Sequence, residues 1–312
     1  HGYSPMKRFV PVLHSVSYAG VWPGQAKLTV SEFIGKATSL GFPAIALVAK
    51  HPHVSPLTYS PAERAALRSQ IADAGLELAA LMGYTDFTCG LRQPGIPSAE
   101  LNAGYVESLC QLCEDLSCRH LRIFTGYRFD SLPYDLQYQE VVRGISLAAE
   151  AAERHNVTLL VQNHHDIAAH HSEFAWILRE INHPRVRAAF DCWSCYLQGV
   201  QGDELRQAVR SMQEWIGLTT VADYHVFPQF QYQPDIVNYQ PTLPLVRATV
   251  PGKGGLDYRS FFRGLHDIGY RGYVAYEMCA PLEGGGGESN LDATARQFLE
   301  FLEEMEQLVG ED

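Results

Sequence analysis

Short apolar runs alternate with amphipathic segments along the whole chain. Apolar runs of this length, bounded by turn residues, are typical of strands buried on both faces, which pair in parallel beneath covering helices. The pattern predicts eight strands, over residues 9–14, 44–48, 76–82, 119–125, 157–162, 186–191, 218–223 and 272–277.

The intervening segments carry apolar residues three and four positions apart, which predicts helices. Thr29 and Ser60 each open a capping box with a glutamate three residues later, and Gly41 and Gly75 end the helices that follow. Six further helices are expected, over about 100–117, 136–155, 173–181, 204–215, 257–267 and 291–308.

Eight alternations of strand and helix, without a break in composition, predict one α/β domain over residues 1–312. The count favours a closed (β/α)8 barrel, the TIM barrel. An open doubly wound sheet would have a glycine-rich turn after its first strand, and residues 15–20 do not form one. The stretch 224–256, after the seventh strand, is rich in Pro, Gln and Tyr, and we expect a long irregular loop that acts as an ordered lid.

Composition limits the partners that the chain is expected to bind. The net charge is −11, only 19% of residues are charged and no basic stripe is present, so neither nucleic acid nor an anionic membrane surface is an expected partner. No apolar run approaches the roughly 20 residues of a membrane span. Seven cysteines, an odd number without a disulfide pattern, favour a reducing, cytoplasmic location. The sequence is compatible with a homo-oligomer.

Polar side chains end four consecutive strands, and a parallel barrel brings such strand ends to one rim. Gln162, Asp191, His225 and Glu277 follow the fifth to the eighth strand. A mixed set of carboxylate, imidazole and amide oxygen suits one divalent ion such as Mn²⁺, Mg²⁺ or Co²⁺, with Zn²⁺ as a further candidate. The alternative is that each acid only caps a loop or forms a salt bridge.

Histidines near the same rim are candidates for proton transfer. His164 lies two residues after Gln162, so strand alternation places it on the inward face, as an acid/base group or as an extra metal ligand. Glu277 could serve both as a metal ligand and as a base. His53, after the second strand, is either a catalytic group or a solvated loop histidine. His165, beside His164, is a candidate for substrate binding.

Four more residues are candidates for substrate contacts. His14 ends the first strand and either points into the barrel or is a hydrogen-bonded core histidine. Trp193 offers a flat face to a sugar ring, although aromatic residues are also ordinary core filling. Asp223 ends the seventh strand, and Arg247 in the long loop could reach a substrate oxygen. Arg122, inside the fourth strand, would need a carboxylate partner if buried.

With these residues the sequence resembles the xylose-isomerase-like barrel superfamily, which includes sugar isomerases and epimerases, inosose dehydratases and apurinic-site endonucleases. The resemblance is clearest at 161–164, Val-Gln-Asn-His, where the group typically has Glu-Asn-His. It continues at Asp191, at Asp223, in 251–258 and in 273–277, and so spans nearly the whole chain.

The resemblance implies one divalent ion held by Glu, Asp, His and Glu, which correspond here to Gln162, Asp191, His225 and Glu277. Two departures weaken this correspondence. Gln162 replaces a carboxylate, and Thr220 stands where the strand-seven histidine of the family often lies. The acidic balance argues against the endonuclease branch, which has a basic DNA-binding face.

The resemblance implies a metal-dependent isomerase or epimerase that acts on a sugar or keto-sugar through an enediolate intermediate. A metal-dependent lyase or dehydratase is the alternative, because the same intermediate can lose a β-leaving group or cleave a glycoside. A third possibility is a sugar-binding barrel without activity, whose metal site has decayed through Gln162.

Overall fold

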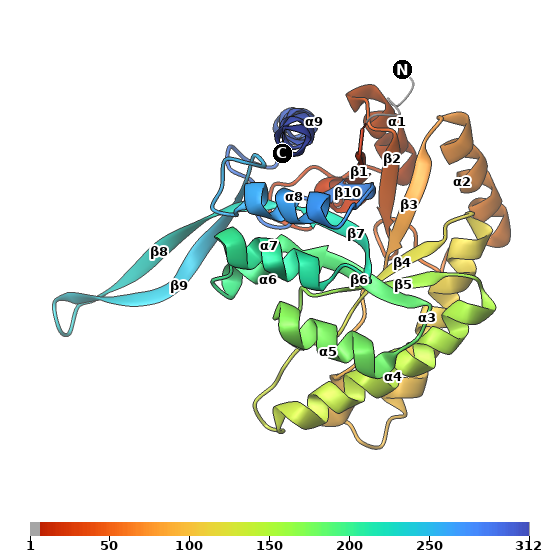
Figure 1. Ribbon diagram of the computed structural model, residues 1–312, viewed down its shortest axis with the longest axis horizontal. Coiled ribbons are helices and arrows are strands. Elements are labelled where there is room, and N and C mark those ends of the chain that lie inside the picture. The colour runs from red at the N-terminus through yellow and green to blue at the C-terminus, as the bar shows by residue number, and fades with distance from the viewer. Residues whose placement is uncertain (1–6, 312) are drawn as a thin grey trace.

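Eight parallel strands close into a barrel in the computed structural model, which describes residues 7–311 (Figure 1). Residues 1–6 and 312 of the expected domain lie outside the described residues. The order around the barrel is β1-β10-β7-β6-β5-β4-β3-β2. The strands are β1 (Phe9–His14), β2 (Ala44–Val48), β3 (Glu77–Met82), β4 (His120–Phe124), β5 (Thr158–Gln162), β6 (Val186–Asp191), β7 (Ile216–Val221) and β10 (Gly272–Tyr276). The TIM-barrel prediction is therefore confirmed.

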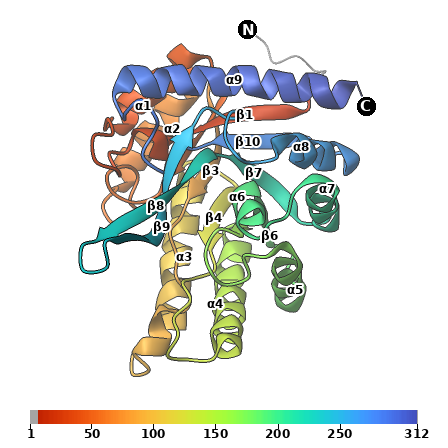
Figure 2. The same ribbon diagram turned by 90° about the vertical axis from the view of Figure 1, so that its left-hand side faces the viewer.

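Helices cover the outside of the barrel, and both predicted capping boxes are formed, at Thr29 and at Ser60. In Figure 2, α9 runs across β1 and α1, so the end of the chain packs on its beginning. The helices are α1 (Val30–Leu40), α2 (Pro61–Asp73), α3 (Ser98–Asp115), α4 (Tyr134–Arg154), α5 (His171–Ile181), α6 (Cys192–Leu197), α7 (Gly202–Ser211), α8 (Tyr258–Asp267) and α9 (Glu288–Gly310). Two short 3₁₀ helices are η1 (Ser15–Tyr18) and η2 (Cys89–Arg92). No helix within 7–311 is both long and apolar enough to cross a membrane.

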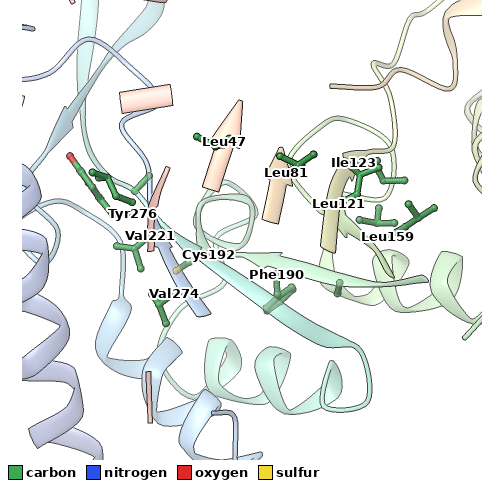
Figure 3. Packing of buried hydrophobic residues seen from close by; sticks show 14 of the residues in the cluster. Leu47, Leu81, Leu121, Ile123, Leu159, Phe190, Cys192, Val221, Val274 and Tyr276 are labelled. Atoms are coloured by element: carbon green, nitrogen blue, oxygen red, sulfur yellow. The ribbon is translucent and has the colours of Figure 1, made fainter. Parts of the chain in front are cut away.

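Alternation along the strands divides the apolar side chains into two clusters. Outward-facing residues such as Leu47, Leu121 and Phe190 pack against the helices (Figure 3). Among the described residues, the cluster inside the barrel contains six alanines: Ala44, Ala46, Ala79, Ala80, Ala189 and Ala275. Such small side chains fill little of the interior. The last inward positions, at the carboxyl ends of the strands, are polar, and they form the site described below.

The segment after β7 is a β-hairpin, so the prediction of a long irregular loop was wrong. β8 (Asp223–Gln233) and β9 (Asn238–Thr249) pair antiparallel and project away from the barrel (Figure 1). Most side chains of the hairpin beyond Val226 are exposed on both faces. The sequence alternates glutamine with Phe230 and Tyr232, which is a strand pattern, but Pro228, Pro241 and Pro244 within the segment favoured a loop.

Candidate active site

A cavity of about 620 Å³ lies at the carboxyl ends of the barrel strands. Alternation on β1, β4 and β5 turns His14, Arg122 and Gln162 inward, in line with Val12 and Leu160 of the inner cluster. The ionisable and amide side chains that line the cavity are His14, Lys27, Lys50, His51, Tyr84, Arg122, Tyr127, Gln162, His164, His165, Glu277 and Cys279. Site residues from both halves of the sequence therefore meet in one space.

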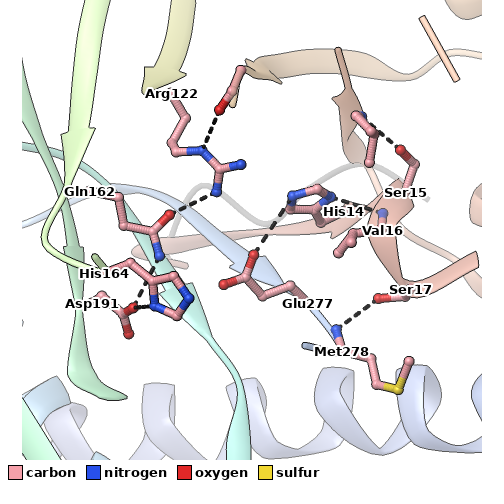
Figure 4. A network of polar contacts seen from close by, with 12 residues as sticks. His14, Ser15, Val16, Ser17, Arg122, Gln162, His164, Asp191, Glu277 and Met278 are labelled. Atoms are coloured by element: carbon pink, nitrogen blue, oxygen red, sulfur yellow. Dashed lines mark hydrogen bonds and ion pairs between the residues drawn. The ribbon is translucent and has the colours of Figure 1, made fainter. Parts of the chain in front are cut away.

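A chain of hydrogen bonds joins three strands at the bottom of this cavity (Figure 4). Arg122 donates from Nη1 to Oε1 of Gln162 at 2.8 Å, and Nε2 of Gln162 donates to Oδ2 of Asp191 at 3.1 Å. The same Asp191 oxygen lies 2.8 Å from Nδ1 of His164. Asn163 fixes the backbone of Asp191, because its Oδ1 accepts the Asp191 N–H at 2.7 Å.

His164 is held in a state suited to proton transfer. Burial lowers its pKa, but the hydrogen bond and negative charge of Asp191 outweigh burial, so the pKa is raised above its ordinary value. Since Asp191 engages Nδ1, Nε2 is the atom left to exchange a proton with a bound molecule. The prediction that His164 faces the interior agrees with this position.

Glu277 and His14 face each other across the end of β10 and β1. Nε2 of His14 lies 3.7 Å from Oε2 of Glu277, and Nδ1 of His14 accepts the N–H of Val16 at 3.0 Å. A neutral His14 therefore carries its proton on Nε2, toward the carboxylate. Burial raises the pKa of Glu277, while it lowers the pKa of His14 well below the ordinary value.

His165 lies at the cavity as a neutral, stacked ring. Its imidazole stacks on Phe124 at 4.0 Å and on Tyr127 at 4.3 Å between ring centroids. Burial, followed by the charges of His164 and Arg122, lowers its pKa to about 3. Its Nδ1 is buried without a hydrogen-bond partner in the described part of the chain. This position is consistent with the predicted substrate contact.

His53, a predicted catalytic residue, serves the structure instead. Its Nδ1 lies 2.8 Å from Oγ of Ser15, and its Nε2 lies 3.0 Å from the carbonyl oxygen of Leu28. Both nitrogens are thus engaged beside Phe33, and the ring is not among the residues lining the cavity. The loop places His51 at the cavity in its stead.

His225 does not line the cavity, contrary to the prediction that it is a metal ligand. It lies at the base of β8, where Nδ1 contacts Glu283 and Nε2 lies 2.8 Å from the carbonyl oxygen of Lys253. Arg247, its neighbour across the hairpin, donates to the carbonyl oxygen of Val246. The hairpin carries both side chains away from the site, which a loop folded over the barrel would not have done.

Asp223 and Trp193 also have structural roles. Asp223 is buried and accepts backbone N–H groups, from Tyr224, Gly252, Gly254 and Leu256. It thereby fixes the base of the hairpin. We predicted that Asp223 contacts the substrate, but it does not line the cavity. Trp193 packs on Tyr196 and Tyr224 with centroid distances of 5.4 and 4.4 Å. Its backbone N–H donates at 2.8 Å to Oδ1 of Asp191, which caps the start of α6.

Lys50 and Tyr84 are among the cavity residues that we did not predict from the sequence, and for Arg122 we predicted only a carboxylate partner. Lys50 follows β2 directly, and its Nζ lies 3.9 Å from the centre of the Tyr84 ring. Arg122 finds an amide partner rather than the carboxylate that we expected. An arginine in an otherwise apolar strand, Leu121 to Phe124, was the available signal.

The donor atoms do not fit the divalent ion that the resemblance implies. Oε1 of Gln162 already accepts a hydrogen bond from the Arg122 cation, and both oxygens of Asp191 accept hydrogen bonds. Thr220, beside Asp191 in the sheet, offers only a hydroxyl group. Within residues 7–311, no three His, Cys, Asp or Glu side chains are placed to hold a metal ion together. We therefore derive no catalytic step through a metal.

A closed parallel barrel whose polar residues gather at the strand ends defines the class of TIM-barrel proteins. The profile of the xylose isomerase-like TIM barrel family matches residues 34–305, so the chain belongs to that family. No curated protein sequence matches the chain.

Solved structures share this fold at low sequence identity. D-psicose 3-epimerase from Clostridium cellulolyticum H10, with D-tagatose, is 17% identical, with a TM-score of 0.71, and the match covers 95% of this chain and 99% of that one. An L-ribulose 3-epimerase is 15% identical, with a TM-score of 0.71 and coverage of 97% and 96%. A probable 3-DHS dehydratase from Bacillus anthracis is 15% identical, with a TM-score of 0.65 and coverage of 93% and 98%.

Proposed function

We propose that the chain is an enzyme that moves a proton next to a carbonyl group of a sugar or keto-sugar, as an isomerase or epimerase. The observation that carries this proposal is the presence of Glu277 and His164 in one cavity. The first is a buried acid with a raised pKa, and the second is an imidazole whose pKa is raised by Asp191. General acid–base catalysis needs such a pair with pKa values near the working pH.

In the proposed reaction, ionised Glu277 removes the proton from the carbon next to the carbonyl group. The electron pair of that C–H bond forms a C=C bond, and negative charge develops on the carbonyl oxygen. His164 then gives its Nε2 proton to the enediolate, either at the former carbonyl carbon or on the opposite face of the carbon that lost its proton. In the first case the neighbouring hydroxyl group becomes the new carbonyl group, and its proton passes to the former carbonyl oxygen. The first outcome is isomerisation and the second is epimerisation.

A lyase is the second candidate, and the His164–Asp191 pair supports it. A protonated imidazole can protonate a departing oxygen. The enediolate oxygen then re-forms the carbonyl group, the C=C electron pair forms a double bond to the β carbon, and the β C–O bond breaks. Glu277 is the single carboxylate among the described residues that line the cavity, whereas epimerisation is served best by a base on each face. A sugar-binding barrel without activity is the third reading.

The test is to incubate the purified protein with keto-sugars in D₂O and to follow the products by NMR. Deuterium next to the carbonyl group supports an isomerase or epimerase, and an unsaturated or cleaved product supports a lyase. We expect Glu277→Gln and His164→Asn each to lower kcat by about 100-fold or more. His225→Asn is the matched control and should retain activity, because His225 lies outside the cavity. Binding without either product would leave the third reading.

A further inference from the structure

The guanidinium group of Arg122 is buried, and only some of its N–H groups have hydrogen-bond acceptors within the described residues. Its side chain comes from the middle of β4, and the residue is 2% exposed. Nη1 donates to Gln162 at 2.8 Å and Nε donates to the carbonyl oxygen of Gly83 at 3.3 Å, but Nη2 is buried without a partner among the described residues. In Figure 4 this third nitrogen points away from Gln162, toward the space beside His14.

An unpartnered guanidinium nitrogen is costly in a protein interior. Arginine stays charged at any working pH, and a buried charged donor without an acceptor loses its hydration without compensation. Two aromatic rings support the guanidinium, Phe124 at 4.0 Å and Tyr84 at 5.0 Å from its central carbon, but neither replaces an acceptor at Nη2. A bound molecule with an anionic oxygen would supply the missing partner.

The charged residues around the cavity also favour an anionic ligand. The whole chain has a net charge of −11. Within the described residues, the cavity is nevertheless lined by three cations, Lys27, Lys50 and Arg122, and by one acid, Glu277. A second acid, Asp191, lies beneath this lining, where Gln162 and His164 engage it, so the cations still outnumber the acids. A concave site with an excess of one charge concentrates ligands of the opposite charge. Binding of a neutral sugar would not explain why the cavity is positive in a chain whose net charge is negative.

We propose that the site binds a sugar acid, whose carboxylate is held by Nη2 of Arg122 and by Lys50, and that Arg122 supplies the positive charge that a divalent ion would otherwise provide. The reaction on this substrate rests on the proposed function, whereas the binding does not. A carboxylate fits better than a phosphate group, because one guanidinium edge and one lysine can neutralise a single negative charge without the backbone cradle that phosphate sites usually have.

Binding of charged and neutral sugar pairs to the full chain tests this proposal. Unfolding temperature and calorimetric affinity would be measured with D-gluconate against D-glucitol and with D-glucuronate against D-glucose, and D-glucose 6-phosphate would serve as the phosphate probe. Each series would be run after EDTA treatment and again with Mn²⁺. We expect the sugar acids to stabilise the protein in both series, their neutral partners to have no effect, and added salt to weaken binding.

Variants assign the binding to particular side chains. Arg122→Gln should remove the stabilisation by the sugar acids. Because Arg122 is buried and its loss could affect folding, Lys50→Met provides a second variant, expected to weaken acid binding about tenfold. Lys253→Met, an exposed lysine absent from the cavity lining, is the matched control and should bind normally.

Several outcomes would overturn the proposal. Neutral sugars that bind as tightly as the acids, stronger binding of the phosphate ester, or no binding of either acid would each contradict the carboxylate site. Binding of one Mn²⁺ per chain, with a higher unfolding temperature, would contradict the replacement of the metal by Arg122. Sugar-acid binding without proton exchange would reject only the proposed function, and exchange on neutral keto-sugars alone would reject only this inference.

Discussion

The carboxyl group of Glu277 is buried, and burial raises its pKa above the ordinary value. A raised pKa means that the folded protein binds this proton more tightly than the unfolded chain does, so the free energy of unfolding falls as pH rises through the folded pKa. Above that pH the ionised carboxylate lowers the free energy of unfolding by a constant amount. We predict that Glu277→Gln, which cannot ionise, stabilises the protein at about pH 8 and loses this advantage near pH 4, in thermal unfolding followed across that range.

Glu283 provides a control with the opposite sign. Its hydrogen bond to His225 lowers the pKa of the Glu283 carboxyl group. A lowered pKa stabilises the folded protein above the unfolded value of about 4.3 and loses this contribution as pH falls through the folded pKa. Glu283→Gln should therefore destabilise the protein slightly at neutral pH. A stability difference for Glu277→Gln that is the same at every pH would contradict our account of its burial.

Single residues also show how far the sequence could predict the site. The strand-end rule led to Gln162, Asp191, His164 and Glu277, and the structure places all four around the cavity floor. It failed for His53, because the partners of that ring, Ser15 and Leu28, come from a distant part of the chain. Contacts of this kind depend on the assembled loops, and local sequence patterns do not report them.

Among the secondary-structure elements, the barrel strands and helices were predictable and the hairpin was not. Continuous apolar runs and capping boxes fix the barrel elements locally, and the first strand was predicted with the bounds Phe9–His14 that the structure shows. The hairpin has most of its side chains in solvent, including Phe230 at 62% and Leu243 at 88% exposure. Its strands pair through the backbone, and the prolines at 228, 241 and 244 made the segment read as a loop.

We predict that the outer hairpin contributes little to the stability of the barrel. Replacing residues 227–245 by Asn-Gly would join Val226 to Val246, which already face each other in the register, through a two-residue turn. The unfolding temperature should change by less than about 2 °C, because few buried contacts are lost. Asp223→Ala in the full-length chain is the comparison, and it should destabilise the protein, since it leaves four backbone N–H groups without their acceptor. A large loss on truncation would show that the hairpin supports the barrel.

At the scale of the whole molecule, Glu306 of α9 joins the two ends of the chain by accepting the N–H groups of Arg8 and Phe9 at 2.6 and 2.7 Å. Because β1 pairs with both β2 and β10, this contact helps to close the barrel. We predict that Glu306→Ala lowers the free energy of unfolding by about 2–4 kcal/mol, the cost of losing two charge-assisted hydrogen bonds. Chemical denaturation followed by circular dichroism and by tryptophan fluorescence should show the same shift, since a closed barrel unfolds as a unit. Glu303→Ala, which removes an exposed ion pair with Lys7 at 3.4 Å, should cost less than about 1 kcal/mol, and equal effects of the two variants would contradict this role of Glu306.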